Sequence, residues 1–369
     1  MRIHSERLQV IRNTNIETTS LVSAPKTHAS NSRWAVLDGW RALSIVSVLS
    51  CHMLPLGPRS WNINGMAGVL GMVLFFTLSG FLIASTLLAR PDWLSFLVRR
   101  ACRILPLAVL AIIVALTWQE KGFWYYVAHL LFYINYRPDY LTPLTSPLWS
   151  LCVEIQFYVF IAALVAIGGR RALWALTLAC LAVTSVRIWT ETYVSIESHL
   201  RADEILAGAV VALLHRAEWA GALRRRVASV PLLAYMVLLL ACCHPSGGVL
   251  NYFRPYVGSA MVASTLWRQN WATGLLSARI LRYLADVSYA VYVIHPIMRL
   301  SCLNSTNVWR LYLVKRPIGF ALTFLLAHLS TFYYEKWWIN LGKRITGHTR
   351  GSAPIVVSGS KQFATSTSG

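Results

Sequence analysis

Three ionisable residues lie within one apolar stretch, LDGWRALSIVSVLSCH, at positions 37–52. On an α-helix, Asp38, Arg41 and His52 share one face, and Arg41 and His52 lie about 16 Å apart along it. A neutral imidazole at His52 could accept a proton from a hydroxyl group, and the guanidinium of Arg41 could hold an anion or an acidic partner. The alternative is charge at the membrane interface together with one buried, hydrogen-bonded histidine.

A second group of candidates is basic. Arg99, Arg100 and Arg103 lie in FLVRRACRILP, directly before an apolar stretch. A spacing of three places Arg100 and Arg103 on one helix face. Such a cluster could bind the phosphates of a cytosolic nucleotide-bearing cofactor. The same cluster is also typical of cytoplasmic helix ends, where arginines orient the chain and contact lipid headgroups.

A carboxylate lies in the apolar segment PLWSLCVEIQFYVF. Glu154 is one helical turn after Ser150 and one before Tyr158, so the three side chains form one stripe. A carboxylate inside a membrane needs a partner, and Arg41 or His52 is the natural candidate. A purely structural salt bridge within the helix is the alternative.

Polar residues also interrupt other apolar segments. Ser79 and Gly80, in FFTLSGFLIA, permit close approach of another backbone or of a ligand, and close helix packing is the simpler interpretation. In LADVSYAVYVIHP, Tyr289 and His295 share a face that we expect to point into a helix bundle, with His295 structural rather than catalytic. Glu204 and its neighbour Asp203 could line the outer mouth of a site or simply stabilise a helix start.

Composition indicates where these residues lie. The chain has 369 residues, of which 56% are hydrophobic and 13% charged, and its formal net charge is +20. A soluble domain usually has about 25% charged residues, so the chain is predicted to be a polytopic membrane protein. Its surplus of Lys and Arg is then explained by cytoplasmic loops, and we expect no nucleic-acid partner.

The hydropathy pattern predicts an all-α polytopic membrane helix bundle of about ten transmembrane helices. A span needs about 20 mostly apolar residues. With the N-terminus inside, most Lys and Arg fall in cytoplasmic segments and both termini are cytoplasmic. The aromatic stretch 123–136 is expected to be interfacial or re-entrant. The ten predicted spans are 36–54, 67–88, 104–118, 148–167, 172–190, 203–215, 229–243, 253–267, 284–300 and 316–334.

Common motifs of other enzyme classes are absent. The chain has no GxSxG elbow, P-loop, HExxH or strand-associated GxGxxG motif. None of its seven cysteines forms a CxxC or CxxH pair, so neither a disulfide framework nor a metal site is expected. These observations argue against a buried serine hydrolase, an ATPase, a zinc protease and a Rossmann enzyme.

Taken in order, the segments LDGWRA, FFTLSGFLI, RRACRILP, PLWSLCVEIQFYV and VSYAVYVIHP resemble the acyltransferase 3 family of integral membrane acyltransferases. The resemblance covers roughly residues 34–335. Its Arg-x10-His pair maps onto Arg41 and His52, its RxxR pair onto Arg100 and Arg103, and its WSLxxE glutamate onto Glu154. Ile155 stands where a second acid is frequent, which leaves Glu154 as the only acid of that helix.

The resemblance implies an O-acetyltransferase that moves an acetyl group from acetyl-CoA onto a sugar hydroxyl of an exported glycan or glycolipid. Exopolysaccharide, O-antigen and lipochitooligosaccharide (a nodulation factor) are the expected acceptor classes. We expect His52, Glu154 and Arg41 to be catalytic, and Arg99, Arg100, Arg103 and Ser79 to contact the donor. No metal is expected. Alternatives are acylation of a small glycosylated natural product, or a glycan transporter or flippase without chemistry.

The predicted organisation is a disordered cytoplasmic arm (1–33), a membrane acyltransferase domain (34–335) and a cytoplasmic tail (336–369). The expected location is the bacterial inner membrane, where the chain is multi-pass and in contact with lipid.

Overall fold

The computed structural model describes residues 34–268, 271–303 and 307–347. The chain divides into Met1–Trp34 and Ala35–Gly369, and every described helix belongs to the second unit. The predicted arm, 1–33, lies outside the described residues, as does the end of the predicted tail.

The described residues form helices joined by turns and loops, without a β-strand, so the prediction of an all-α membrane helix bundle is confirmed. The α-helices are α1 (Ala35–Met53), α2 (Ile63–Ala89), α3 (Trp93–Trp118), α4 (Phe123–Leu130), α5 (Trp149–Ala172), α6 (Ala175–Trp189), α7 (Asp203–Arg216), α8 (Gly221–Ser229), α9 (Leu232–Cys243), α10 (Arg254–Trp267), α11 (Trp271–Leu276), α12 (Arg279–Leu303), α13 (Val308–Arg310), α14 (Arg316–Leu329) and α15 (Lys336–Ile345).

A helix forms in each of the ten predicted spans, but the number of membrane crossings stays a prediction. Four described segments are long and apolar enough to cross a membrane: Arg59–Ala89, Trp93–Trp118, Ser146–Ala172 and Leu311–Ile345. Two bent helix pairs raise this number to six if each pair is one span. The last segment is continuous through α15, so the predicted domain boundary at residue 335 falls inside a helix.

Two glycines bring α2 and α7 into backbone contact. A Cβ atom on Gly80 would lie 1.8 Å from the carbonyl oxygen of Ile205, and one on Gly208 would lie 2.1 Å from that of Thr77. No side chain larger than hydrogen fits at either position. Close helix packing at Gly80 is therefore what the structure shows.

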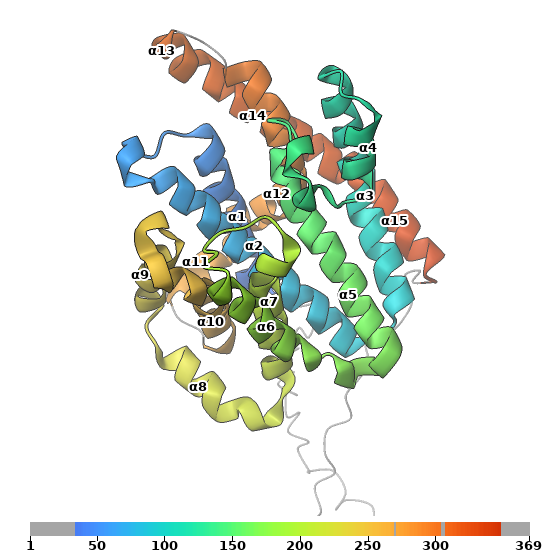
Figure 1. Ribbon diagram of the computed structural model, residues 1–369, viewed down its shortest axis with the longest axis vertical. Coiled ribbons are helices and arrows are strands. Elements are labelled where there is room, and N and C mark those ends of the chain that lie inside the picture. The colour runs from blue at the N-terminus through green and yellow to red at the C-terminus, as the bar shows by residue number, and fades with distance from the viewer. Residues whose placement is uncertain (1–33, 269–270, 304–306, 348–369) are drawn as a thin grey trace, which may run out of the picture. The chain divides into compact units, whose positions relative to one another are not determined.

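Helices α2, α3, α5 and α12 contribute side chains beside the face of α1 that carries Arg41. Helix α1 contacts α2 and α12, while α3 contacts α5, α12 and α15. Figure 1 shows α3, α5 and α15 side by side, with α4 and α13 at one end of the helices and α8 near the other. This arrangement brings residues from α1, α2, α3, α5 and α12 to one cavity.

Candidate active site

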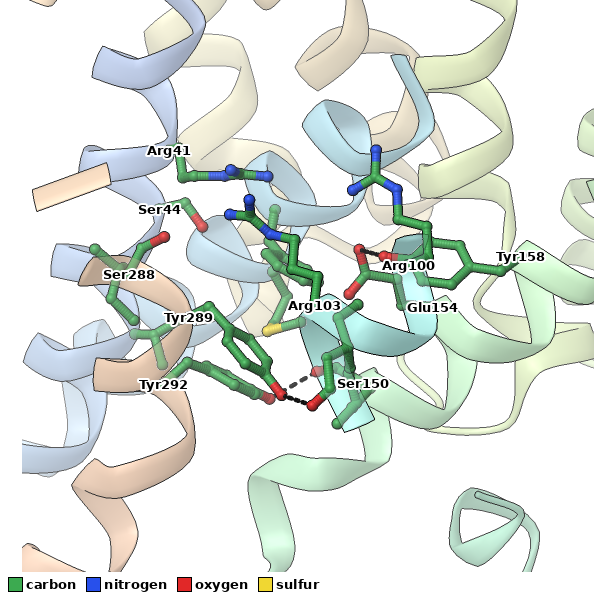
Figure 2. Close-up of a pocket in the computed structure, with 16 residues that line it drawn as sticks. Arg41, Ser44, Arg100, Arg103, Ser150, Glu154, Tyr158, Ser288, Tyr289 and Tyr292 are labelled. Atoms are coloured by element: carbon green, nitrogen blue, oxygen red, sulfur yellow. Dashed lines mark hydrogen bonds between the residues drawn. The ribbon is translucent and has the colours of Figure 1, made fainter. Parts of the chain in front are cut away.

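Arginines from two helices line a narrow internal cavity, which we call the arginine cavity. Arg41 comes from α1, Arg100 and Arg103 from α3, and Glu154 from α5. Figure 2 shows the three guanidinium groups on one side of the cavity and the Glu154 carboxylate beside them. The free volume is about 50 Å³. The structure thus brings together four of the seven residues that the sequence predicts for the site.

The positive charge of this cavity is not matched by acids. Among the described residues, no carboxylate lies within 4.0 Å of the guanidinium of Arg41, Arg100 or Arg103. Arg100 instead lies over the rings of Phe96 and Tyr158, each 5.7 Å from its guanidinium carbon. Three cations and one carboxylate in a buried cavity favour the binding of an anion.

Glu154 is held by two hydroxyl groups rather than by an arginine. Ser79 Oγ donates to its Oε1 at 2.8 Å, and Tyr158 OH donates to the same oxygen at 2.7 Å. All three side chains are buried. Glu154 therefore has one hydrogen-bond partner from its own helix, α5, where the predicted stripe places Tyr158. Its second hydrogen-bond partner comes from α2. The structural alternative, an intrahelical salt bridge, is not what the described residues form.

Ser79 and Arg99, which are predicted to contact acetyl-CoA, do not line the arginine cavity. Ser79 lies behind Glu154, and its assignment to the donor stays a prediction. The Arg99 side chain donates to the Ser95 carbonyl of its own helix at 3.1 Å, and α15 packs close to its backbone at Gly342. Asp38 is buried, but it lines neither this cavity nor the next one.

His52 lines a second and wider cavity of about 410 Å³, which we call the His52 pocket. The two cavities share part of their wall, formed by Val48 of α1, Met72 of α2 and Tyr292 of α12. Tyr292 OH donates to the carbonyl of Pro147 and lies 2.6 Å from Ser150 Oγ, a contact visible in Figure 2. The two cavities therefore adjoin at Val48, Met72 and Tyr292, and His52 lines the second of them.

The neighbour of His52 is a second histidine and not Glu154. The rings of His52 and His295 lie 5.2 Å apart between centroids. Nδ1 of His295 is 2.8 Å from the Tyr292 carbonyl, and since a carbonyl only accepts, this nitrogen carries the hydrogen. Glu154 lines only the arginine cavity. The polar stripe of α12 was the sequence signal for His295, which was predicted to be structural.

A separate cluster of buried charges lies around the start of α7. Asp203 pairs with Arg187 of α6, and Glu204 pairs with Arg254 of α10 at 2.6 Å. Both carboxylates are fully buried and neither lines the His52 pocket, so they do not form an outer mouth. Arg201, which approaches Glu204 at 3.4 Å, does line that pocket. Sequence reasoning missed Arg201, because its burial depends on contacts far along the chain.

Comparisons with known proteins agree with this architecture. The family model described as an acyltransferase domain matches residues 34–339. A candidate peptidoglycan O-acetyltransferase of Bacillus subtilis is 28% identical over 357 residues, covering 81% of this chain and 54% of the relative. The peptidoglycan O-acetyltransferase of Listeria monocytogenes is 23% identical over 359 residues, with the same two coverages.

Other similar proteins match a shorter part of the chain. A candidate O-acetyltransferase of Staphylococcus aureus is 28% identical over 151 residues, which are 34% of this chain and 23% of the relative. No solved structure matches. The chain spans about half the length of the Bacillus and Listeria relatives. Because the family model covers most of the sequence, the chain belongs to the acyltransferase 3 family of membrane acyltransferases.

Proposed function

We propose that this chain is a membrane O-acetyltransferase that moves an acetyl group from acetyl-CoA to a hydroxyl group of a glycan. The observation that carries the proposal is the pair of adjoining cavities. One is lined by three arginines without a carboxylate partner in the described residues, and the other contains His52. The sequence-predicted Arg-x10-His pair links them along α1.

The donor would occupy the arginine cavity. Arg100 and Arg103 can contact phosphate oxygens through charge-assisted hydrogen bonds, and Arg41 adds a third guanidinium to the lining. A narrow cavity suits a thin, flexible chain such as the pantetheine arm of coenzyme A. Glu154, fixed through Oε1 by Ser79 and Tyr158, can orient the nearby guanidinium groups without neutralising all of them.

The acceptor would enter the His52 pocket, and acetyl transfer would take place there. The acceptor hydroxyl oxygen forms a bond to the thioester carbonyl carbon, and its proton passes to the neutral imidazole of His52. The carbon–sulfur bond then breaks, and the coenzyme A thiolate takes up the proton from the imidazolium. General base catalysis of this kind contributes about 10²- to 10⁴-fold to the rate.

The similar proteins support a glycan as the acceptor, because two of them are named for peptidoglycan O-acetylation. The sequence resemblance adds exopolysaccharide, O-antigen and lipochitooligosaccharide as candidate acceptors. We further propose that the chain lies in the bacterial inner membrane with both termini in the cytoplasm. The arginine cavity would then face the cytosolic donor, and His52 would lie toward the outer side.

The proposal is tested by the consumption of acetyl-CoA and the appearance of ester-bound acetate on a glycan, using the purified full chain in lipid nanodiscs. The variant His52→Ala should lose transfer by about 10²- to 10⁴-fold at unchanged membrane abundance. Near-normal acetylation by this variant would remove His52 from the mechanism. A transporter or flippase would move glycan without consuming acetyl-CoA, so the same assay separates the two classes.

A further inference from the structure

Arg201 is a charged residue that has no role in the acetyl transfer proposed for His52 and the arginine cavity. It lies between the short turn Ser198–Leu200 and α7, and only 1% of its surface is exposed. Its guanidinium lies over the ring of Trp149, at 5.5 Å, and both residues line the His52 pocket. Among the described residues that line that pocket, Arg201 is the one side chain with a permanent charge.

The surrounding charges do not balance. Among the described residues, Arg187, Arg201 and Arg254 share two carboxylates, Asp203 and Glu204, so this buried network keeps one surplus positive charge. A buried charge without a counterion is costly. An anionic group brought to the network by a ligand would remove that cost.

Of the three arginines, Arg201 has the most donors without a hydrogen-bond partner in the described part of the chain, since Arg187 leaves only Nε without one. Arg254 uses Nε on Glu204, Nη1 on Asn251 and Nη2 on the Tyr193 carbonyl. Arg201 approaches Glu204 through Nη2 alone, at 3.4 Å. In the described part of the chain, its buried Nε and Nη1 have no hydrogen-bond partner. The Nε and Nη1 hydrogens point in different directions, so each can donate to a separate anionic oxygen.

We propose that Arg201 binds a negatively charged oxygen of the reacting complex in the His52 pocket. The inference rests on the proposed acetyl transfer. The oxygen comes either from a carboxylate of an acidic sugar in the acceptor or from the thioester carbonyl as the acceptor oxygen adds to it. A cavity of about 410 Å³ has room for a sugar residue together with the acetyl group.

The test compares Arg201→Lys and Arg201→Gln with Arg254→Lys in the purified full chain. Arg254→Lys is the matched control, because Arg254 belongs to the same network and does not line the pocket. Three quantities are measured for each variant: the melting temperature with glucuronate against glucose, acetyl-CoA hydrolysis without glycan, and acetate bound to envelope glycans in cells, corrected for abundance.

A carboxylate source predicts that glucuronate, and not glucose, raises the melting temperature of the wild type and of Arg254→Lys but not that of the Arg201 variants. An oxyanion source predicts that the Arg201 variants hydrolyse acetyl-CoA about 10- to 100-fold more slowly than Arg254→Lys. Arg201 variants that match the control in all three measurements would overturn the inference. A wild type that neither hydrolyses acetyl-CoA nor acetylates glycan, yet shows the glucuronate shift, would reject the proposed function and retain an anion site.

Discussion

The molecule contains two buried clusters rich in arginine, and they differ in how their charges are matched. In the cluster around α7, which we call the paired cluster, Asp203 and Glu204 are fully buried and pair with Arg187 and Arg254. Among the described residues that line the arginine cavity, Glu154 is the one acid beside Arg41, Arg100 and Arg103, and its hydrogen bonds come from hydroxyl groups.

An ionisable residue inside a membrane bundle is therefore not by itself a sign of a binding site. A cation whose donors are all used stabilises the helices that supply its partners. A cation whose donors face a cavity is available to a ligand. Arg201 combines the two situations, since it touches the paired cluster and lines the His52 pocket.

Mutations in the paired cluster should reduce stability the most. Glu204→Gln removes the carboxylate that Arg254 contacts at 2.6 Å and leaves buried guanidinium groups uncompensated. Breaking a buried ion pair from one side costs about 3–5 kcal/mol. We expect a large fall in melting temperature and in membrane abundance, measured by fluorescence-detected thermal unfolding. A normal melting temperature would mean that the paired cluster is not structural.

A smaller loss of stability is expected at the contact that joins the two regions. Gly80→Ala forces α2 and α7 apart, because its Cβ would lie 1.8 Å from the Ile205 carbonyl oxygen. Overpacking of this kind costs about 1–3 kcal/mol. Gly274→Ala, where nothing lies within 4 Å of the added atom, is the control in the same unfolding measurement. Equal melting temperatures for the two variants would contradict the backbone contact.

The arginine cavity should respond in activity and not in stability. Arg41→Gln removes one of three neighbouring cations, so we expect no fall in melting temperature. A hydrogen bond to a charged group contributes about 1.5–3 kcal/mol, so acetyl transfer should fall about 10- to 100-fold. Initial rates at varied acetyl-CoA concentration check this prediction. Unfolding of this variant at lower temperature, with transfer retained, would place Arg41 in the structural class.

A mutation of Ser79, which contacts Glu154, should reduce activity the least. Ser79→Ala removes one of two hydrogen bonds to Oε1 and leaves that of Tyr158. Because the lost bond is to a charged group, we expect a cost of about 1.5 kcal/mol, at the low end for such bonds. The loss should appear as a modest rise in the KM for acetyl-CoA. A complete loss of transfer would instead indicate that Ser79 contacts the donor directly, as the sequence predicts.

Local patterns in the sequence predicted a large part of this molecule. Hydropathy located a helix in each of the ten predicted spans, and helical spacing placed Tyr158 on Glu154 and Arg100 with Arg103. Hydropathy could not give the number of membrane crossings. The chain bends by about 100° after α7 and by about 120° after α9, and such bends are set by how neighbouring helices pack.

Contacts between distant segments could not be predicted from the sequence. Ser79 meets Glu154 across 75 positions, and Arg254 meets Glu204 across 50. Both contacts depend on which helix faces pack together, which periodicity alone leaves open. For the same reason the partner expected for Glu154, namely His52 or Arg41, is replaced by two hydroxyl groups, and the neighbour of His52 is His295.

Whether the arginine cavity binds the acetyl donor can be measured as the equilibrium binding of coenzyme A to the purified full chain by isothermal titration calorimetry. The comparison is between Arg100→Gln/Arg103→Gln, which changes the cavity lining, and Arg99→Gln, which changes an arginine of the same helix outside it. We predict that coenzyme A binds the wild type and Arg99→Gln equally, and binds the double variant at least about tenfold more weakly. Pantetheine, which lacks the nucleotide phosphates, should bind all three alike. Unchanged coenzyme A binding by the double variant, or an equal loss in Arg99→Gln, would contradict the assignment of the arginine cavity to the donor.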